Sequence, residues 1–222
     1  YELSKNPMAM DMYDKLSHTD GLNFNPSDWA LDIIERNHCC ECYKYQLVYN
    51  HNPRAIKFIK KMLNEFNRYS WAELLKNPNA IEIIVDNLAH IKNASTIYAN
   101  TNEAVLEIIK RMPIAIDPYE RVYYLATNPA PWAIELLKSE EITRGIITAL
   151  CNNSHPWAIE QVSQHLHKLD GREWNLLSNN SGAIHILRAN PDKITTSIWS
   201  NPEIFEPTQR PEIFAILTEI LW

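Results

Sequence analysis

The octapeptide Asn77-Pro78-Asn79-Ala80-Ile81-Glu82-Ile83-Ile84 is the clearest copy of a motif that recurs along the whole chain. With its Ala as the reference, the gaps between copies are 21, 25, 25, 25, 28, 25, 25 and 21 residues. The reference positions are Ala9, Ala30, Ala55, Ala80, Val105, Ala133, Ala158, Ala183 and Ile204. A recurrence at this period is typical of repeat proteins, whose units stack because each one is too short to bury its own apolar face.

Comparison of the copies predicts which face of each unit is buried. The residue after the reference is apolar in every copy, and the third and fourth residues after it are apolar in nearly all. The second residue after it is charged or His in every copy. This pattern predicts an amphipathic helix with a broad buried stripe. The Asn-Pro pair before it predicts an N-cap followed by proline at the first helical position. A shorter apolar stretch upstream, as in 71–75, 123–126 and 174–178, predicts a preceding helix.

We therefore predict an all-α protein, an α-solenoid of about nine stacked helix-turn-helix repeats of about 25 residues. We expect one continuous domain over residues 1–222. The chain enters in the middle of a repeat, and its last segment, 213–222, is apolar without a polar capping face. Since solenoid ends normally need polar caps, we expect either a longer array or self-association through these apolar ends.

Composition argues against several classes of function. The chain has 222 residues, a net charge of −6 and a sequence pI near 5.8, which disfavours nucleic acid as a partner because phosphate binding needs clustered Lys and Arg. Four Gly are few for glycine-rich nucleotide loops. No apolar run reaches the length of a membrane span. Three of the four Cys are crowded together, a poor disulfide framework, so we expect reduced thiols in an intracellular protein.

Two segments carry a resemblance to a known family. They are Ser70 to Ala80 and Glu173 to Glu206, which includes Trp174-Asn-Leu-Leu-Ser-Asn-Asn-Ser-Gly-Ala-Ile and Trp199-Ser-Asn-Pro-Glu-Ile-Phe-Glu. The chain resembles the Trp-x-x-Leu-Ser-x-Asn-Pro-x-Ala-Ile repeat proteins encoded in multiple copies by giant nucleocytoplasmic DNA viruses. The resemblance implies a viral protein with an interaction role, acting in the host cytoplasm or in the virion, and it brings no catalytic residues. A weaker resemblance, to leucine-rich variant repeats, would also imply a helical solenoid.

The motif His38-Cys39-Cys40-Glu41-Cys42 is the one cluster of metal-ligand type. His38, Cys39 and Cys42 could contribute to a zinc site, but a tetrahedral site needs four ligands and adjacent Cys residues cannot easily face one ion. We favour small thiols packed in a helix, and expect no metal and no cofactor. Cys151 could pair with His155 or His165, although its position beside a core leucine favours a buried structural thiol. Ser-His-Asp, Walker and metalloprotease patterns are absent from the sequence, so we expect no enzyme.

Three Trp residues occupy the position just before the reference, where the other copies have Met, Arg, Asn, Ala, Gly or Glu. Each stands three residues before an acid, on one helix face: Trp29 with Asp32, Trp132 with Glu135, and Trp157 with Glu160. One interpretation is an exposed aromatic and acidic face that binds a protein partner with a basic segment. The other is that each Trp folds over a turn two residues longer than elsewhere, as in 128–132. The leading hypothesis is a non-enzymatic interaction scaffold or adaptor, and the alternative is a structural virion component.

Overall fold

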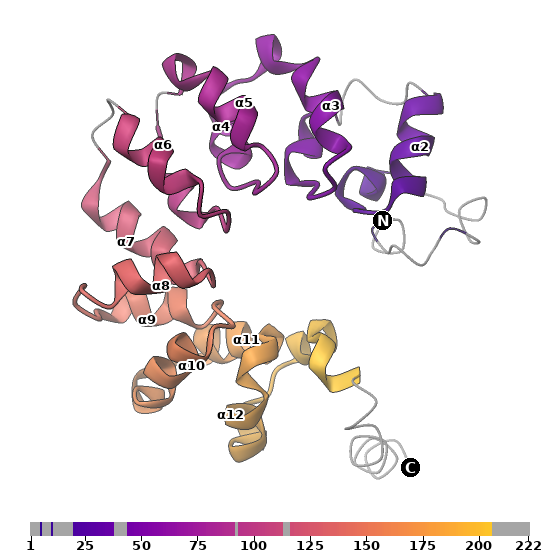
Figure 1. Ribbon diagram of the computed structural model, residues 1–222. Helices are drawn as coiled ribbons and strands as arrows, with labels where there is room; N and C mark the ends of the chain where they lie inside the picture. Colours follow the sequence, from indigo (N-terminus) through magenta and orange to yellow (C-terminus); the bar gives the residue numbers. More distant parts are fainter. Residues whose placement is uncertain are drawn as a thin grey trace. The chain divides into compact units, whose positions relative to one another are not determined.

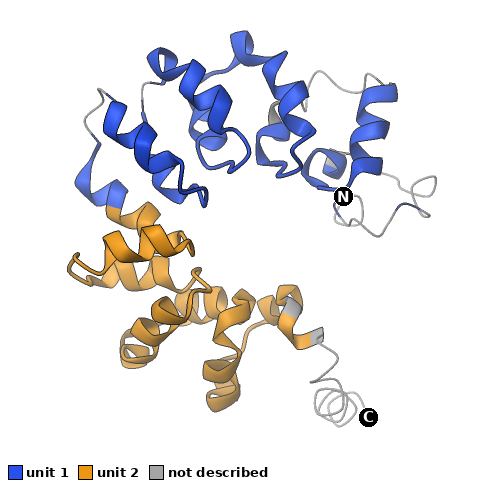
Figure 2. Ribbon diagram, viewed as in Figure 1, with its two compact units in different colours: residues 1–121 blue, residues 122–222 orange. Residues whose placement is uncertain are grey.

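The computed structural model describes residues 5, 10, 20–37, 44–91, 93–112 and 116–205, and this part of the chain contains helices and no strands. The predicted all-α class is confirmed. The chain divides into two compact units, residues 1–121 and residues 122–222, shown in different colours in Figure 2. Within each unit, short α-helices follow one another in chain order, and short 3-10 helices lie between some of them (Figure 1). The predicted single domain over 1–222 remains a prediction.

The first unit contains the following described elements: η2 (Asp20–Phe24), α2 (Asp28–Asn37), η3 (Lys44–Tyr49), α3 (Ala55–Lys60), η4 (Leu63–Glu65), α4 (Arg68–Leu74), α5 (Ile81–Asp86), η5 (Leu88–His90), η6 (Ser95–Ala99) and α6 (Val105–Arg111). Helix α7 (Pro118–Thr127) begins in the first unit and ends in the second. The second unit continues with α8 (Pro131–Leu137), α9 (Arg144–Leu150), α10 (Pro156–Ser163), η7 (Leu166–Lys168), α11 (Gly171–Asn179), η8 (Ser181–Ala183), α12 (Ile184–Ala189), η9 (Pro191–Lys193), η10 (Thr196–Ser200) and η11 (Pro202–Phe205).

The reference position of the motif is the centre of the buried stripe. Seven copies from Ala30 to Ala183 are fully buried, and the residue four positions later is also buried in most copies, as in Ile84 and Leu137. The third position is less uniform, because Leu136 is 38% exposed. The buried stripe is therefore narrower than predicted. Several of these helices have only six to eight residues. Each therefore has only about two turns with which to pack against its neighbours.

A buried asparagine begins the turn before each of the eight described copies of the motif, and these residues are the rung asparagines: Asn25, Asn50, Asn77, Asn100, Asn128, Asn153, Asn180 and Asn201. Each Oδ1 accepts the backbone N–H of the residue two positions later. In six of them, the Nδ2 also donates to two backbone carbonyls of the preceding turn, at 2.8–3.1 Å. Asn153, for example, bonds the carbonyls of Ala126 and Asn128. One side chain thus shapes its own turn and holds it against the turn before.

This geometry corrects the predicted role of the Asn-Pro pair. Helix α5 begins at Ile81 with Ala80 as its N-cap, so Asn77 lies outside the helix. Proline stands in the first turn of α8 and α10, but there it is Pro131 and Pro156, which do not follow a rung asparagine. The predicted N-cap role is therefore wrong for α5, whereas η11 follows the prediction, because it begins at Pro202 directly after Asn201 and the Asn201 side chain accepts the Glu203 N–H.

A second set of polar residues lies in the connections that follow the motif helices, and these residues cap the next helix. The N-cap side chains of Asn67, Asp170 and Thr195 accept backbone N–H groups of the first helical turn. Asp170 and Glu173 form a reciprocal capping box, in which the Glu173 carboxylate accepts the Asp170 N–H at 3.0 Å. This capping satisfies donors that the helix itself leaves unpaired.

Polar side chains on the solvent side also join segments that lie one turn apart in the series. The Nδ2 groups of Asn52, Asn79 and Asn102 donate to carbonyls 24–28 residues earlier, at 2.6–3.0 Å. Ion pairs of similar sequence separation join Arg54 to Asp32 and Lys60 to Glu82, both at 2.7 Å. Exposed ion pairs stabilise a fold only slightly. Among the polar contacts, the hydrogen bonds of the buried asparagines therefore contribute most to holding successive turns in place.

Candidate functional site

The three predicted Trp residues differ in their exposure. Trp132 is only 8% exposed, and its buried Nε1 has no hydrogen-bond partner among the described residues. The prediction of an exposed face is therefore wrong for Trp132, because its indole is buried in the fold rather than exposed to solvent. Trp29 and Trp157 are half-buried and keep part of their surface in solvent.

Two of the three predicted acids are neutralised by a cation of the chain. Asp32 accepts a hydrogen bond from Arg54 at 2.7 Å, and this bond raises the pKa of the arginine. Glu135 pairs with Lys138 at 2.5 Å on the same helix. Glu160 is exposed and forms no ion pair within the described part of the chain. Of the predicted pairs, Trp157 with Glu160 is therefore the one that presents both an accessible ring and an uncompensated charge.

A hollow of about 400 Å³ lies beside Glu160 and is widely open to solvent. Its walls come from α10 and from the turn that begins α12, and they consist of Ser154, Pro156, Ile159, Glu160, Ser163, Gly182 and His185. Gly182 is required here, since a Cβ at this position would lie 2.7 Å from the carbonyl oxygen of Ser154. The close contact of these two turns forms the floor beside the acid.

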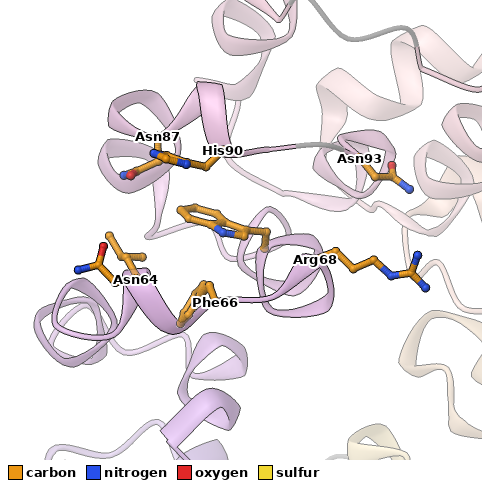
Figure 3. Close-up of a pocket in the computed structure, with 8 residues that line it drawn as sticks. Asn64, Phe66, Arg68, Asn87, His90 and Asn93 are labelled. Atoms are coloured by element: carbon orange, nitrogen blue, oxygen red, sulfur yellow. The ribbon is translucent and has the colours of Figure 1, made fainter.

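A second cavity, the aromatic pocket, has a volume of about 360 Å³ and lies in the first unit. It is lined by Leu63, Asn64, Phe66, Arg68, Trp71, Asn87, His90 and Asn93. In Figure 3, Asn64 and Phe66 lie on one side of the opening, and Asn87 and His90 lie on the other. Arg68 and Asn93 lie at the end opposite Asn64 (Figure 3). The rings of Phe66 and Trp71 meet edge to face at 5.5 Å.

The aromatic pocket was not among the predicted sites, although the chain contains a signal for it. The pocket lies between two successive connections, and each contains an asparagine that accepts a backbone N–H of the following helix. Asn67 is the N-cap of α4, and Asn93, 26 positions later, accepts the N–H of Ser95, the first residue of η6. Aligning the copies on these caps, rather than on the alanine, would have placed the exposed polar residues of the two connections side by side.

Cys151 is buried, as the sequence predicted for a structural thiol. Burial, together with the negative charge of Glu173, raises the pKa of the Cys151 thiol to about 12. A nucleophilic cysteine requires the opposite change, because the thiolate is the reactive form. The candidates His38, Cys39 and Cys42 lie outside the described residues. Within the described part, no group of three His, Cys, Asp or Glu side chains could hold a metal ion.

Comparison with known proteins gives no family assignment: no family model, no curated protein and no solved structure matches the chain. Among the helices of the described residues, none has the length and apolar character needed to cross a membrane.

Proposed function

We propose that the chain is an α-solenoid of about nine stacked repeats that acts as a non-enzymatic scaffold and binds a protein partner. The observation that carries this proposal is the recurring bond set of the rung asparagines, in which the same two carbonyl acceptors of the preceding turn are used six times. A bond set that depends only on the neighbouring turn supports a stack of units, each of which contacts the next. Solenoids of this kind present long surfaces for binding.

We place the binding face of this scaffold at Trp157 and Glu160, beside the hollow on α10. The half-buried indole offers apolar contact area, and the unpaired carboxylate favours a basic segment of the partner. The buried Trp132 is not part of this face. A viral origin and a site of action inside the host cell belong to the same proposal, and they rest on the sequence resemblance alone.

Affinity capture followed by mass spectrometry tests the scaffold function. The parent chain and a Trp157→Ser/Glu160→Gln variant would be compared in infected or expressing cells. A Trp199→Ser/Glu203→Gln variant is the matched control, because Trp199 is exposed and the two residue types are the same. We expect a partner that the parent and the control retain and the first variant loses, with equal thermal melts for all three.

Two outcomes would contradict the proposal in different ways. A partner that all three proteins retain would leave a scaffold whose binding face lies elsewhere. A chain that captures nothing from cells, but is found in stoichiometric amount in purified virus particles, would instead favour the structural virion component.

A further inference from the structure

The aromatic pocket differs in charge from the rest of the molecule. The chain carries a net charge of −6, yet none of the eight residues that line this pocket is acidic, and they include Arg68 and His90. The Arg68 guanidinium donates to the hydroxyl of Tyr69 at 2.5 Å and lies 4.6 Å from the centre of that ring. Within the described part of the chain, no carboxylate forms an ion pair with it. The tyrosine therefore holds the guanidinium in place without neutralising its charge.

Three asparagine side chains at the rim keep hydrogen-bonding groups that the fold does not use. Asn64 is exposed and makes no side-chain hydrogen bond to a described residue. Asn87 donates its Nδ2 to the carbonyl of Ile83 at 2.8 Å, which leaves its Oδ1 as an acceptor. Asn93 accepts the Ser95 N–H with its Oδ1, which leaves its Nδ2 as a donor. A primary amide carries the same donor and acceptor types as a peptide bond, so these groups can pair with the backbone of an extended chain.

The floor of the pocket is apolar. Trp71 is 8% exposed and packs edge to face against Phe66, and Leu63 is half-buried beside them. The volume of about 360 Å³ lies at the lower end of the range of ligand pockets, which suits one apolar side chain with the adjoining backbone. The opening runs from Asn64 to Arg68, with Phe66 and His90 on opposite sides (Figure 3). A single opening thus has an apolar floor, a rim of amide side chains and a cationic group at one end.

We propose that the aromatic pocket binds an extended peptide segment of a protein partner, with an apolar side chain against Phe66 and Trp71 and a neighbouring carboxylate against Arg68. The occupant is an acidic peptide because the charges are complementary: a guanidinium without a carboxylate partner recognises a carboxylate through charge-assisted hydrogen bonds. This site is separate from the Trp157 and Glu160 face, and the two favour opposite charges.

Three labelled heptapeptides test this site directly. Fluorescein-labelled Ser-Gly-Asp-Leu-Asp-Gly-Ser would be titrated with the full chain at low ionic strength, alongside versions with Asn-Leu-Asn and Lys-Leu-Lys at the centre. We expect fluorescence anisotropy to show the tightest binding for the acidic peptide. This order is diagnostic, because the net charge of −6 would by itself favour the Lys peptide.

Variants assign the binding to the pocket. Arg68→Gln should weaken the acidic peptide about fivefold and leave the Asn peptide unchanged, since about 1 kcal/mol is the upper value for an exposed ion pair. Asn64→Ala, at an exposed position, should weaken both peptides equally. Arg172→Gln is the matched control, because Arg172 is also exposed in the first turn of a helix that follows a polar N-cap and should change neither affinity.

The proposal is overturned if none of the peptides binds, if the three bind equally, or if Arg68→Gln leaves the preference for the acidic peptide unchanged. Displacement of the peptide by millimolar inorganic phosphate would show a simple anion site and would overturn it as well. These outcomes leave the capture experiment on Trp157 and Glu160 unaffected, so the scaffold proposal and the aromatic pocket can fail independently.

Discussion

The side chain of a rung asparagine combines three hydrogen bonds that no other residue type can make at the same place. Its oxygen accepts an N–H two residues ahead, and its amide nitrogen donates to two carbonyls of the preceding turn, as Asn153 does at 2.9–3.0 Å. Aspartate has the same shape but cannot donate when ionised, and glutamine is longer by one methylene. Because buried backbone carbonyls cost free energy when they lack a partner, these positions accept little substitution.

Replacement of a rung asparagine should therefore destabilise the fold far more than replacement of its neighbour. Asn153 is fully buried and Asn152 is exposed. We expect Asn153→Ala to lower the free energy of unfolding by about 2–4 kcal/mol, because it leaves two buried carbonyls and one N–H without their partner. Asn152→Ala should change it by less than about 0.5 kcal/mol. Equal urea midpoints for the two variants would show that the bond set does not hold the turns together.

The raised pKa of Cys151 makes a prediction for thiol reactivity. At pH 8.5 the folded protein should leave Cys151 unmodified by iodoacetamide, and modification should appear in denaturing urea; peptide mass spectrometry separates it from the other cysteines. The pKa rises from 9.0 to about 12 on folding, so the unfolded chain releases its proton first as the pH increases. The stabilising contribution of the neutral thiol is complete below pH 9 and is lost as the pH rises toward 12. Rapid modification of the folded protein would contradict the buried position.

Among the structural elements, the turns are more demanding than the helices. The turn that begins at Asn180 lies directly against the turn of Ser154. This close approach is possible because Gly182 has no side chain. Gly171, the first residue of α11, has nothing within 4 Å of the position of a Cβ. The two glycines thus perform different tasks: one permits contact between turns, and the other starts a helix.

Alanine substitution at the two glycines should have opposite effects. Gly182→Ala places a methyl group 2.7 Å from the Ser154 oxygen and 3.2 Å from the side chain of Ile159, and we expect a loss of about 1–3 kcal/mol as the turns separate. Gly171→Ala should stabilise the chain by about 0.5 kcal/mol, because alanine restricts the unfolded chain more than glycine does. Thermal unfolding of both variants measures the difference. A neutral Gly182→Ala would mean that the two turns can move apart without cost.

The sequence was sufficient to predict the helices and the buried reference position, because apolar spacing records helix faces directly. It did not reveal the rung asparagines, since the turns have two lengths. Asn77 precedes the reference alanine by three residues, whereas Asn50 precedes Ala55 by five. An alignment on Asn-Pro therefore selects Asn52, which bonds a neighbouring turn from the solvent side. The burial of Trp132 could not be predicted either, because the spacing of apolar residues does not show how a ring is oriented beside a longer loop.

At the scale of the whole molecule, the pattern of bonds predicts how stability is distributed. The rung bonds reach only to the preceding turn, some 21–29 residues back in the chain. The described part of each unit is built in this way, so most polar contacts are local in the sequence. A molecule with nearest-neighbour coupling opens in segments, whereas a domain with one shared core opens as a whole.

Hydrogen exchange on the Asn153→Ala variant distinguishes these two cases. On the proposed solenoid, amide exchange should accelerate most in peptides from residues 126–183, which contain the broken bonds and the turns on either side. The acceleration should decrease with distance in the sequence and be small in peptides from 44–91, because the rung bonds of these turns reach only to the turns next to them, at 23–25 and at Asn100, and not to the turn of Asn153. The exposed Asn152→Ala variant provides the background for each peptide. Equal acceleration in 44–91 and 126–183 would contradict nearest-neighbour coupling and indicate a single cooperative domain, which would remove the main physical support for the solenoid.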